Sequence, residues 1–180
     1  MDHVDDPPAE VWTHPSVTVR SSSIAGNGLF FDTDLDAGII VIRLGGRLVD
    51  FAELHRMFAR AASSGEYIDT FAVGEDTHIV LPPCTSAHFG NHSCEPTVWP
   101  ISAYELATRR PVAAGEELTV DYGAISDDDE FRMTCECGTV SCRRLVTGRN
   151  WRRAELQRRY EGHWPPGLQR RIAGLIAKPQ

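Results

Sequence analysis

Four cysteines have the types and spacing of one metal site. Cys135, Cys137 and Cys142 form a CxCx4C array, and Cys94 precedes them in the segment Asn-His-Ser-Cys. Four thiolates around one ion are typical of structural zinc, and they leave no coordination position open for a reactive water. The alternative is a cluster of free thiols. If one ion binds all four, the CxCx4C segment folds back over the Asn-His-Ser segment, and we expect the active site in the space between them.

The composition indicates a single domain in a reducing compartment. The chain has 180 residues, 42% of them hydrophobic, which is enough for a substantial core. No apolar run approaches the ~20 residues of a membrane span, and the N-terminus lacks the features of a signal peptide. Five cysteines, an odd number, favour metal ligation over disulfides, and the remaining Cys84 is expected to be a small buried residue. We expect a cytoplasmic protein without a membrane partner. Arginine is far more frequent than lysine, which favours a bacterial source. If the source is eukaryotic, we expect a nuclear protein.

The charge is unevenly distributed along the chain. Residues 1–142 carry 8 arginines against 23 acidic residues, a net charge of −15, whereas residues 143–180 carry 10 basic and 2 acidic residues, a net charge of +8. An acidic body would attract a cationic substrate. Alternatively, the basic segment packs against its own acidic body. The acidic run at 127–130 is typical of a solvated loop.

The basic C-terminal segment raises a second class of function. Arg152, Arg153, Arg158 and Arg159 fall within one expected helix and could contact phosphates. Nucleic-acid binding through this segment is therefore an alternative, although such a run is more often a solvated helix face.

The elements that must position these residues are short. Alternating hydrophobicity, glycine turns and proline breaks predict strands and helices. The sequence before residue 17 is polar and rich in proline, which predicts a flexible leader. We expect strands at 17–20, 29–31, 39–44, 47–49, 67–73, 78–81, 98–101, 104–107 and 118–122, and helices at 51–63, 151–160 and 168–176.

Four motifs in one order carry a family resemblance. They are Gly26-x-Gly28-Leu-Phe, Asn91-His-Ser-Cys-x-Pro, Gly-Glu-Glu-Leu-Thr-x-Asp-Tyr122 and the CxCx4C array. In this order and spacing they resemble the SET-domain protein lysine methyltransferases with a post-SET zinc motif. The resemblance implies a mainly β (α+β) fold of several small sheets, with pseudoknot-like threading near the C-terminal end and short C-terminal helices. It divides the chain into a leader (1–16), a SET domain (17–124), a post-SET zinc-binding flap (125–148) and a basic helical C-terminal extension (149–180).

The activity implied by the resemblance is methyl transfer from S-adenosylmethionine to the ε-amine of a lysine. The acidic body favours a basic protein or peptide as substrate, such as a histone-like, ribosomal or DNA-binding protein. The alternative is a zinc-stabilised SET fold that binds without catalysis. For the side chain of His92, the alternative to a cofactor role is a core histidine satisfied by the backbone. The resemblance assigns cofactor binding to Gly26, Asn27, Gly28, Leu29, His88, Phe89, Asn91 and His92, and zinc binding to Cys94, Cys135, Cys137 and Cys142.

The resemblance also assigns the substrate lysine channel. Tyr122 matches the catalytic tyrosine of the family, and Tyr67 and Val120 would line the channel with it. The alternative for Tyr67 is a core strand residue. His88 stands where the family commonly has arginine, and Val120 stands where it often has an aromatic residue. Because the residue at position 120 influences how many methyl groups the channel admits, the sequence does not predict that number. It does not predict the oligomeric state either.

Overall fold

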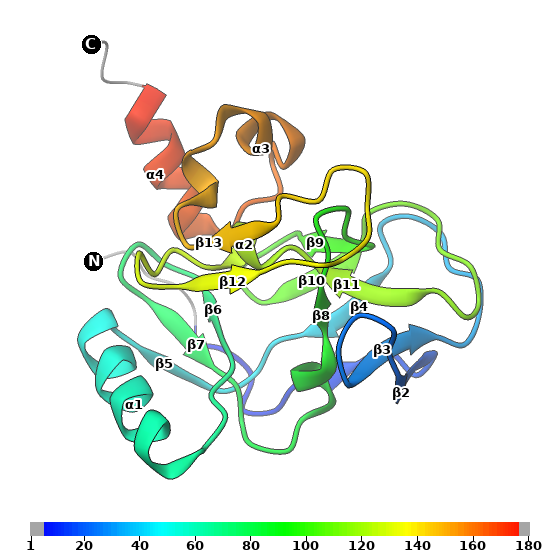
Figure 1. Ribbon diagram of the computed structural model, residues 1–180, viewed down its shortest axis with the longest axis horizontal. Coiled ribbons are helices and arrows are strands. Elements are labelled where there is room, and N and C mark those ends of the chain that lie inside the picture. Colours follow the sequence, from blue (N-terminus) through cyan, green and yellow to red (C-terminus); the bar gives the residue numbers. More distant parts are fainter. Residues whose placement is uncertain (1–5, 177–180) are drawn as a thin grey trace.

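The computed structural model describes residues 6–176, which form mainly short strands (Figure 1). Residues 1–5 of the predicted leader (1–16) and residues 177–180 of the predicted extension (149–180) lie outside the described residues. The strands are β1 (Trp12–Thr13), β2 (Val17–Ser21), β3 (Asn27–Phe31), β4 (Ile40–Arg43), β5 (Arg47–Val49), β6 (Thr70–Ala72), β7 (His78–Val80), β8 (Asn91–His92), β9 (Val98–Pro100), β10 (Glu105–Thr108), β11 (Glu117–Val120), β12 (Arg132–Thr134) and β13 (Leu145–Thr147). The helices are α1 (Phe51–Ser64), α2 (Tyr122–Ile125), α3 (Ala154–Arg159) and α4 (Pro166–Ile176), with 3₁₀ turns η1 (Ser86–Phe89) and η2 (Asn150–Arg152).

The strands form several small sheets. Two four-stranded sheets have the orders β1-β4-β10-β9 and β2-β3-β11-β8, a three-stranded sheet has the order β5-β7-β6, and β12 and β13 form a hairpin. Within the second sheet, β11 pairs antiparallel with β3 and parallel with β8. This pairing places the glycine turn before β3 and the Asn-His pair of β8 on the two sides of β11. The predicted mainly β fold of small sheets with short helices is confirmed.

The longest helix, α1, begins and ends as its sequence dictates. The Asp50 carboxylate accepts the backbone N–H of Glu53, and Gly65 ends the helix in the left-handed conformation at φ 74°. Leu54 and Ala61 are buried on its inner face. The helix predicted at 51–63 is therefore confirmed. Among the described residues, no helix is long and apolar enough to cross a membrane.

The segment around Tyr122 differs from the prediction. The strand expected at 118–122 ends at Val120, and Tyr122 begins the short helix α2. The cause is Asp121, whose carboxylate accepts the backbone N–H of Gly123 and caps the helix. The tyrosine therefore lies at a strand-to-helix turn instead of at a strand end.

Part of the predicted leader is hydrogen-bonded to the rest of the chain. Strand β1 pairs antiparallel with β4, and the backbone N–H of Gly46 donates to the carbonyl of Pro8 at 2.8 Å. The polar, proline-rich sequence hides this edge strand because its stabilisation comes from hydrogen bonds to a distant strand, not from local pattern.

Two predictions of burial are also wrong. Cys84 is exposed, because the chain after Pro82 and Pro83 turns at the surface with Cys84 at φ 62°. Conversely, the run 127–130 is not simply a solvated loop, since Asp127 is 2% exposed. Its carboxylate lies between a histidine of β7 and an arginine of α4.

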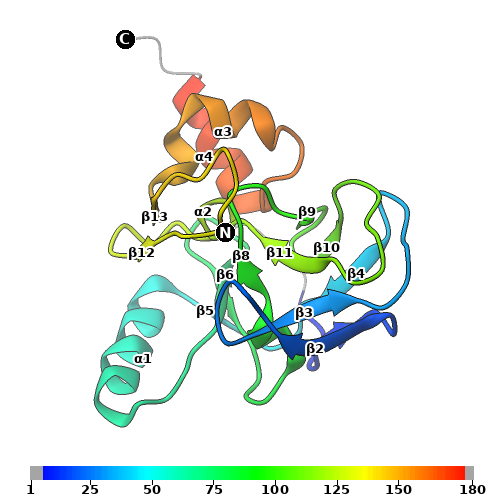
Figure 2. The same ribbon diagram turned by 45° about the vertical axis from the view of Figure 1, so that its right-hand side comes forward.

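The C-terminal segment packs on the rest of the chain through its own hydrophobic cluster. Trp151, Leu156, Tyr160, Trp164 and Leu168 are buried together, and this cluster includes Ala124 of α2. Figure 2 shows α3 and α4 stacked over α2 and β13, away from α1 and β2.

Ion pairs join the basic segment to acidic residues of the body. Arg143 pairs with Asp121, Arg171 pairs with Asp127, and Arg149 lies 3.2 Å from Asp129. Of the two interpretations of the uneven charge, packing of the basic segment against its own acidic body is what these contacts show.

Candidate active site

The four cysteines of the predicted metal site lie together. Their Sγ atoms all lie within 4.8 Å of one another, and those of Cys94 and Cys142 are 3.8 and 3.7 Å from that of Cys135. A tetrahedral ion with Zn–S bonds of about 2.3 Å separates its sulfurs by about 3.8 Å. The cluster therefore has the dimensions of a four-cysteine zinc site and fits that ion.

Burial disfavours the charged form of the two buried thiols in the cluster, and a cation beside them would offset this effect. Burial raises the pKa of Cys94 and, more strongly, that of Cys135. The backbone N–H of Arg143 donates to the Cys94 sulfur at 3.3 Å, as N–H groups do around thiolate ligands. The chemistry of the donor set is thus compatible with a post-SET zinc motif.

The glycine turn before β3 is held in place by one carboxamide and one carboxylate. The Asn91 Nδ2 donates to the carbonyls of Ala25 and Asn27 at 3.2 and 3.0 Å, and to Glu117 Oε1 at 2.8 Å. Glu117 also accepts from the hydroxyl of Ser22 at 2.8 Å. Because its Nδ2 is engaged in these bonds, the side chain of Asn91 holds the turn in shape, and its assignment to the cofactor stays a prediction.

Glycine is required at both positions of this turn, for different reasons. Gly26 adopts φ 48° and a Cβ there would meet nothing within 4 Å, so the turn is bent but open on its outer side. At Gly28 a Cβ would lie 2.2 Å from Glu117 Oε1. The exposed backbone at 25–27 is suited to the ammonium and carboxylate of an amino acid such as that of S-adenosylmethionine.

The side chain of His92 has a structural role. It is 4% exposed; its Nδ1 accepts the backbone N–H of Tyr122 at 3.1 Å, and its Nε2 lies 3.4 Å from the Cys94 sulfur. Burial lowers the pKa of His92 to about 4, so the ring is neutral. A cofactor role for His92 therefore concerns its backbone, and the same holds for the fully buried Leu29.

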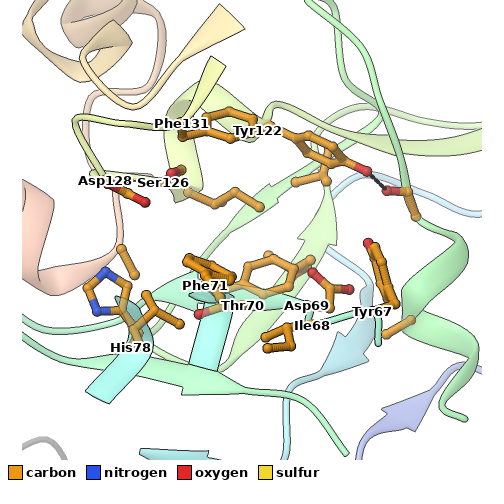
Figure 3. A pocket seen from close by; sticks show the side chains of 18 of the residues that line it. Tyr67, Ile68, Asp69, Thr70, Phe71, His78, Tyr122, Ser126, Asp128 and Phe131 are labelled. Atoms are coloured by element: carbon orange, nitrogen blue, oxygen red, sulfur yellow. Dashed lines mark hydrogen bonds between the residues drawn. The ribbon is translucent and has the colours of Figure 1, made fainter. Parts of the chain in front are cut away.

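A pocket of about 600 Å³ opens on the other side of Tyr122 (Figure 3). Its walls are mainly apolar and come from α1, β6, β11 and the segment 125–132. Tyr67, Val120 and Tyr122, the three predicted channel residues, all line it. Its volume is in the range of small-molecule and side-chain binding sites. Three carboxylates, those of Asp69, Asp128 and Glu130, also line it together with one guanidinium, that of Arg132. The acidic side chains outnumber the basic one, which favours a cation.

Tyr122 borders both sides of the site, one with its hydroxyl and the other with its ring. It donates to the carbonyl of Gly90 at 2.8 Å, next to the Asn-His pair of β8, while its ring lines the pocket. Burial, with the nearby Tyr67 and Asp69, raises the pKa of Tyr122 well above its usual value. The phenol therefore stays neutral and acts as a hydrogen-bonding group, not as a base.

Tyr67 lies at the mouth of the pocket, so the alternative of a core strand residue does not hold. It is 66% exposed, and β6 begins only at Thr70. Partial burial of the ring and the charge of Asp69 raise the pKa of Tyr67 to about 12. The rings of Tyr67 and His88 meet edge to face, with centroids 5.4 Å apart.

The remaining predicted cofactor residues are oriented differently from one another. His88 is directed toward Asp69, at 3.3 Å, and toward the carbonyl of Pro82, at 3.0 Å. Phe89 is 37% exposed and has a flat ring available to an adenine. The assignment of these residues to the cofactor stays a prediction.

Sequence reasoning missed several residues of the site. Asp69 and Glu117 lie inside the motifs that identified Tyr67 and Tyr122, and a search for carboxylates within those motifs would have found them. Asp121 could have been singled out as the residue before the tyrosine, but its partners Arg143 and Tyr160 come from far along the chain. No local signal marks those long-range contacts.

The fold and the site together define a class of protein with known members. The methyltransferase domain of human histone-lysine N-methyltransferase SETMAR shares the fold, with a TM-score of 0.59 and 23% identity over 75% of this chain and 58% of that one. Two curated relatives are human histone-lysine N-methyltransferase 2B, 31% identical over 73% of this chain, and Arabidopsis thaliana histone-lysine N-methyltransferase ATX2, 33% identical over 77%. The matched region is only 5% of the human relative and 14% of the plant one.

The family follows from the sequence profile of the SET domain. That profile matches residues 26–123, more than half of the chain. The chain therefore belongs to the SET-domain family, as its motifs predicted. The match begins at the glycine turn and ends just after Tyr122, so it contains the turn, the Asn-His pair of β8 and Tyr122, whereas the pocket wall at 125–132 lies beyond it.

Proposed function

We propose that the protein transfers a methyl group from S-adenosylmethionine to the ε-amine of a lysine in a basic protein or peptide. One observation carries the proposal: Tyr122 lines the pocket with its ring and contacts the segment before β8 with its hydroxyl. A single residue thus borders both the space for a substrate side chain and the segment that the family uses for its cofactor. The histone-lysine specificity of the relatives supports a basic substrate such as a histone-like protein.

The pocket can prepare a lysine for the reaction. A free lysine has a pKa of ~10.4, so presenting it neutral near pH 7.4 costs ~4 kcal/mol. Apolar walls from Phe71, Val120 and Ile125 would desolvate the amine and lower its pKa. S-adenosylmethionine, when bound, would supply a methyl group on a positively charged sulfur.

The chain's own residues then orient the amine. The neutral Tyr122 hydroxyl and the Gly90 carbonyl lie at one end of the pocket, where they can hydrogen-bond the incoming amine. An amine held there would offer its lone pair to the methyl group that a bound S-adenosylmethionine would supply, and the proton that the product ammonium gives up would go to water. The main contribution of the protein to the reaction rate would be the alignment of the two reactants.

The cysteine cluster would hold a structural zinc ion in this proposal. The four ligands leave no open coordination position, so the ion supplies folding free energy rather than chemistry. It fastens the segment 135–142 to Cys94, directly beside His92.

The test is transfer of labelled methyl to a panel of basic proteins that includes histones. Wild type should label lysine, and Tyr122→Phe should lower kcat by about 100-fold, as loss of one catalytic hydrogen-bond donor does. Tyr104→Phe is the matched control, because Tyr104 packs against the same core but lies outside the pocket. No transfer by wild type, with cofactor binding absent in calorimetry, would favour the non-catalytic binding module instead.

A further inference from the structure

The segment from η2 to the end of α4 lies directly over the helix that begins with Tyr122. Both views show α3 and α4 stacked on the side of α2 (Figures 1 and 2). This segment, residues 150–176, lies beyond the residues 26–123 that match the SET domain profile. Its contacts with α2 are therefore a feature of this chain that the family match does not account for.

The first contact is at the beginning of α2. Asp121, the residue that caps the helix, is 1% exposed. Its carboxylate accepts a hydrogen bond from the Tyr160 hydroxyl at 2.8 Å and is paired with the Arg143 guanidinium. Tyr160 is itself 1% exposed, so the extension reaches a deeply buried carboxylate.

The second contact is just past the end of α2. Asp127 is 2% exposed and is paired with Arg171 of α4 on one side. On the other side its Oδ1 lies 2.8 Å from Nε2 of His78, which lines the substrate pocket. Arg171 is thus joined through one buried carboxylate to the wall of the pocket.

Between these two contacts the packing is close. Ala124 of α2 belongs to the same hydrophobic cluster as Trp151 and Leu168. A Cβ on Gly123 would lie 2.6 Å from Oδ1 of Asn150, so only glycine lets the extension approach this near. The extension therefore contacts α2 at its start, its middle and its end.

A helix as short as α2 has no stable position of its own. It has four residues, far fewer than an isolated helix needs to form in water. Its position is decided by tertiary contacts, and a shift of 1 Å in a reacting group can cost 10²-fold in rate.

We propose that the C-terminal helical extension is part of the active site, with Tyr160 and Arg171 as positioning residues for Tyr122. Tyr160 fixes the cap of α2 through Asp121, and Arg171 fixes its end and the pocket wall through Asp127 and His78. This inference rests on the proposed function, since it assigns the extension a role in the same methyl transfer.

The experiment compares two variants with one control in the full chain. Tyr160→Phe removes the hydroxyl and keeps the buried ring, and Arg171→Met removes the charge but keeps an apolar group over Trp151, 4.5 Å from the guanidinium in the wild type. Arg158→Met removes an equal charge from an exposed position of α3. The readouts are kcat and KM for histone and cofactor, zinc content, and amide hydrogen exchange of the peptide that contains residues 121–126.

We expect kcat to fall at least fivefold in both variants while the KM for the cofactor and the zinc content stay as in wild type. Hydrogen exchange at 121–126 should become faster in both variants and remain unchanged in Arg158→Met. Arg171→Lys, which keeps a cation near Asp127, should recover part of the activity and keeps the test valid if Arg171→Met does not fold.

Two failures are distinguishable. If wild type transfers methyl and both variants match Arg158→Met in kcat and in exchange, the positioning role is overturned while the proposed function stands. If wild type transfers no methyl to any protein, the proposed function fails, and unchanged exchange at 121–126 in the variants would overturn the positioning role independently of turnover.

Discussion

The Asp69 carboxylate lies 3.3 Å from Nδ1 of His88, whose ring meets that of Tyr67 edge to face at the mouth of the pocket. The hydrogen bond to Asp69 is the main cause that raises the pKa of His88 above its usual value. The pairing with Asp69 thus favours the charged form of His88, at a position where the family commonly has arginine.

Replacement of Asp69 by Asn should lower the pKa of His88. The raised pKa means that this pair stabilises the fold fully below the ordinary pKa of histidine, and that the stabilisation is lost as pH rises through the raised value. NMR titration of the His88 ring in wild type and in Asp69→Asn measures the shift. His14 serves as the internal reference because its backbone hydrogen bonds go to Val17 and Val41 and not to Asp69. An unchanged His88 titration in Asp69→Asn would contradict the assignment.

The acidic rim of the pocket should attract a basic substrate. Glu130 is exposed where it lines the pocket, and Glu130→Gln should raise the KM for a histone substrate a few-fold at low salt with little change in kcat. The difference should disappear at about 1 M salt, where the screening length is about 3 Å. Glu161→Gln, at an exposed position outside the pocket, is the control and should behave as wild type. Equal KM values for the two variants at low salt would argue against electrostatic attraction by the rim.

Removal of zinc should abolish methyl transfer. Chelation, or Cys137→Ser, should lower the zinc content from about one ion per chain, lower the Tm and release the segment 135–142 from Cys94. Metal analysis and thermal melting measure this without reference to activity. Cys84→Ser, at the exposed cysteine outside the cluster, should retain zinc and activity. An active wild-type protein that contains no zinc would refute the structural role of the cluster.

The rate of methyl transfer should rise with pH from about 7 to 9.5. The substrate lysine, with an ordinary pKa of ~10.4, becomes neutral more often as pH rises. Because the pKa of Tyr122 is raised by burial, its hydroxyl stays protonated over this range and the rise continues without a tyrosine-dependent fall. The measurement is kcat/KM against pH, with circular dichroism at each pH to confirm folding. A maximum below pH 8 in a protein that remains folded would be inconsistent with a neutral Tyr122.

Substitution of Gly28 should weaken cofactor binding. A Cβ at Gly28 would displace the Glu117 carboxylate, which lies 2.2 Å from the Cβ position, and so disturb its bonds to Ser22 and Asn91. We expect Gly28→Ala to raise the Kd for S-adenosylmethionine about tenfold in calorimetry. Gly174→Ala is the control, since a Cβ there meets nothing within 4 Å, and in the helix it should stabilise the fold by up to about 1 kcal/mol. Equal cofactor affinity in the two variants would show that the turn does not contribute to binding.

The parts of this protein that were predictable from sequence are those set by local chemistry. The cysteine spacing predicted the cluster, the spacing of apolar residues predicted α1, and the motif ending in Tyr122 indicated the pocket. Each of these features depends on residues close together in the sequence, or on cysteines that are recognised as ligands of one metal ion.

The parts that were not predictable depend on distant partners. Asp127 looked like part of a solvated loop because its pairing with Arg171 joins residues 44 positions apart. Strand β1 was hidden for the same reason, as its partner is β4. Charge and hydropathy patterns along the chain do not indicate which acidic residue pairs with a given arginine.

The contacts of Arg171 with Asp127 and of Tyr160 with Asp121 also set the order of events during biosynthesis. A nascent chain that has just added Tyr122 still lacks both of these residues. At about 5–20 residues per second, the ribosome needs roughly 3–10 s more to reach position 171. The amino-terminal sheets can form in that interval, but α2 acquires its final support only after position 171 has been translated.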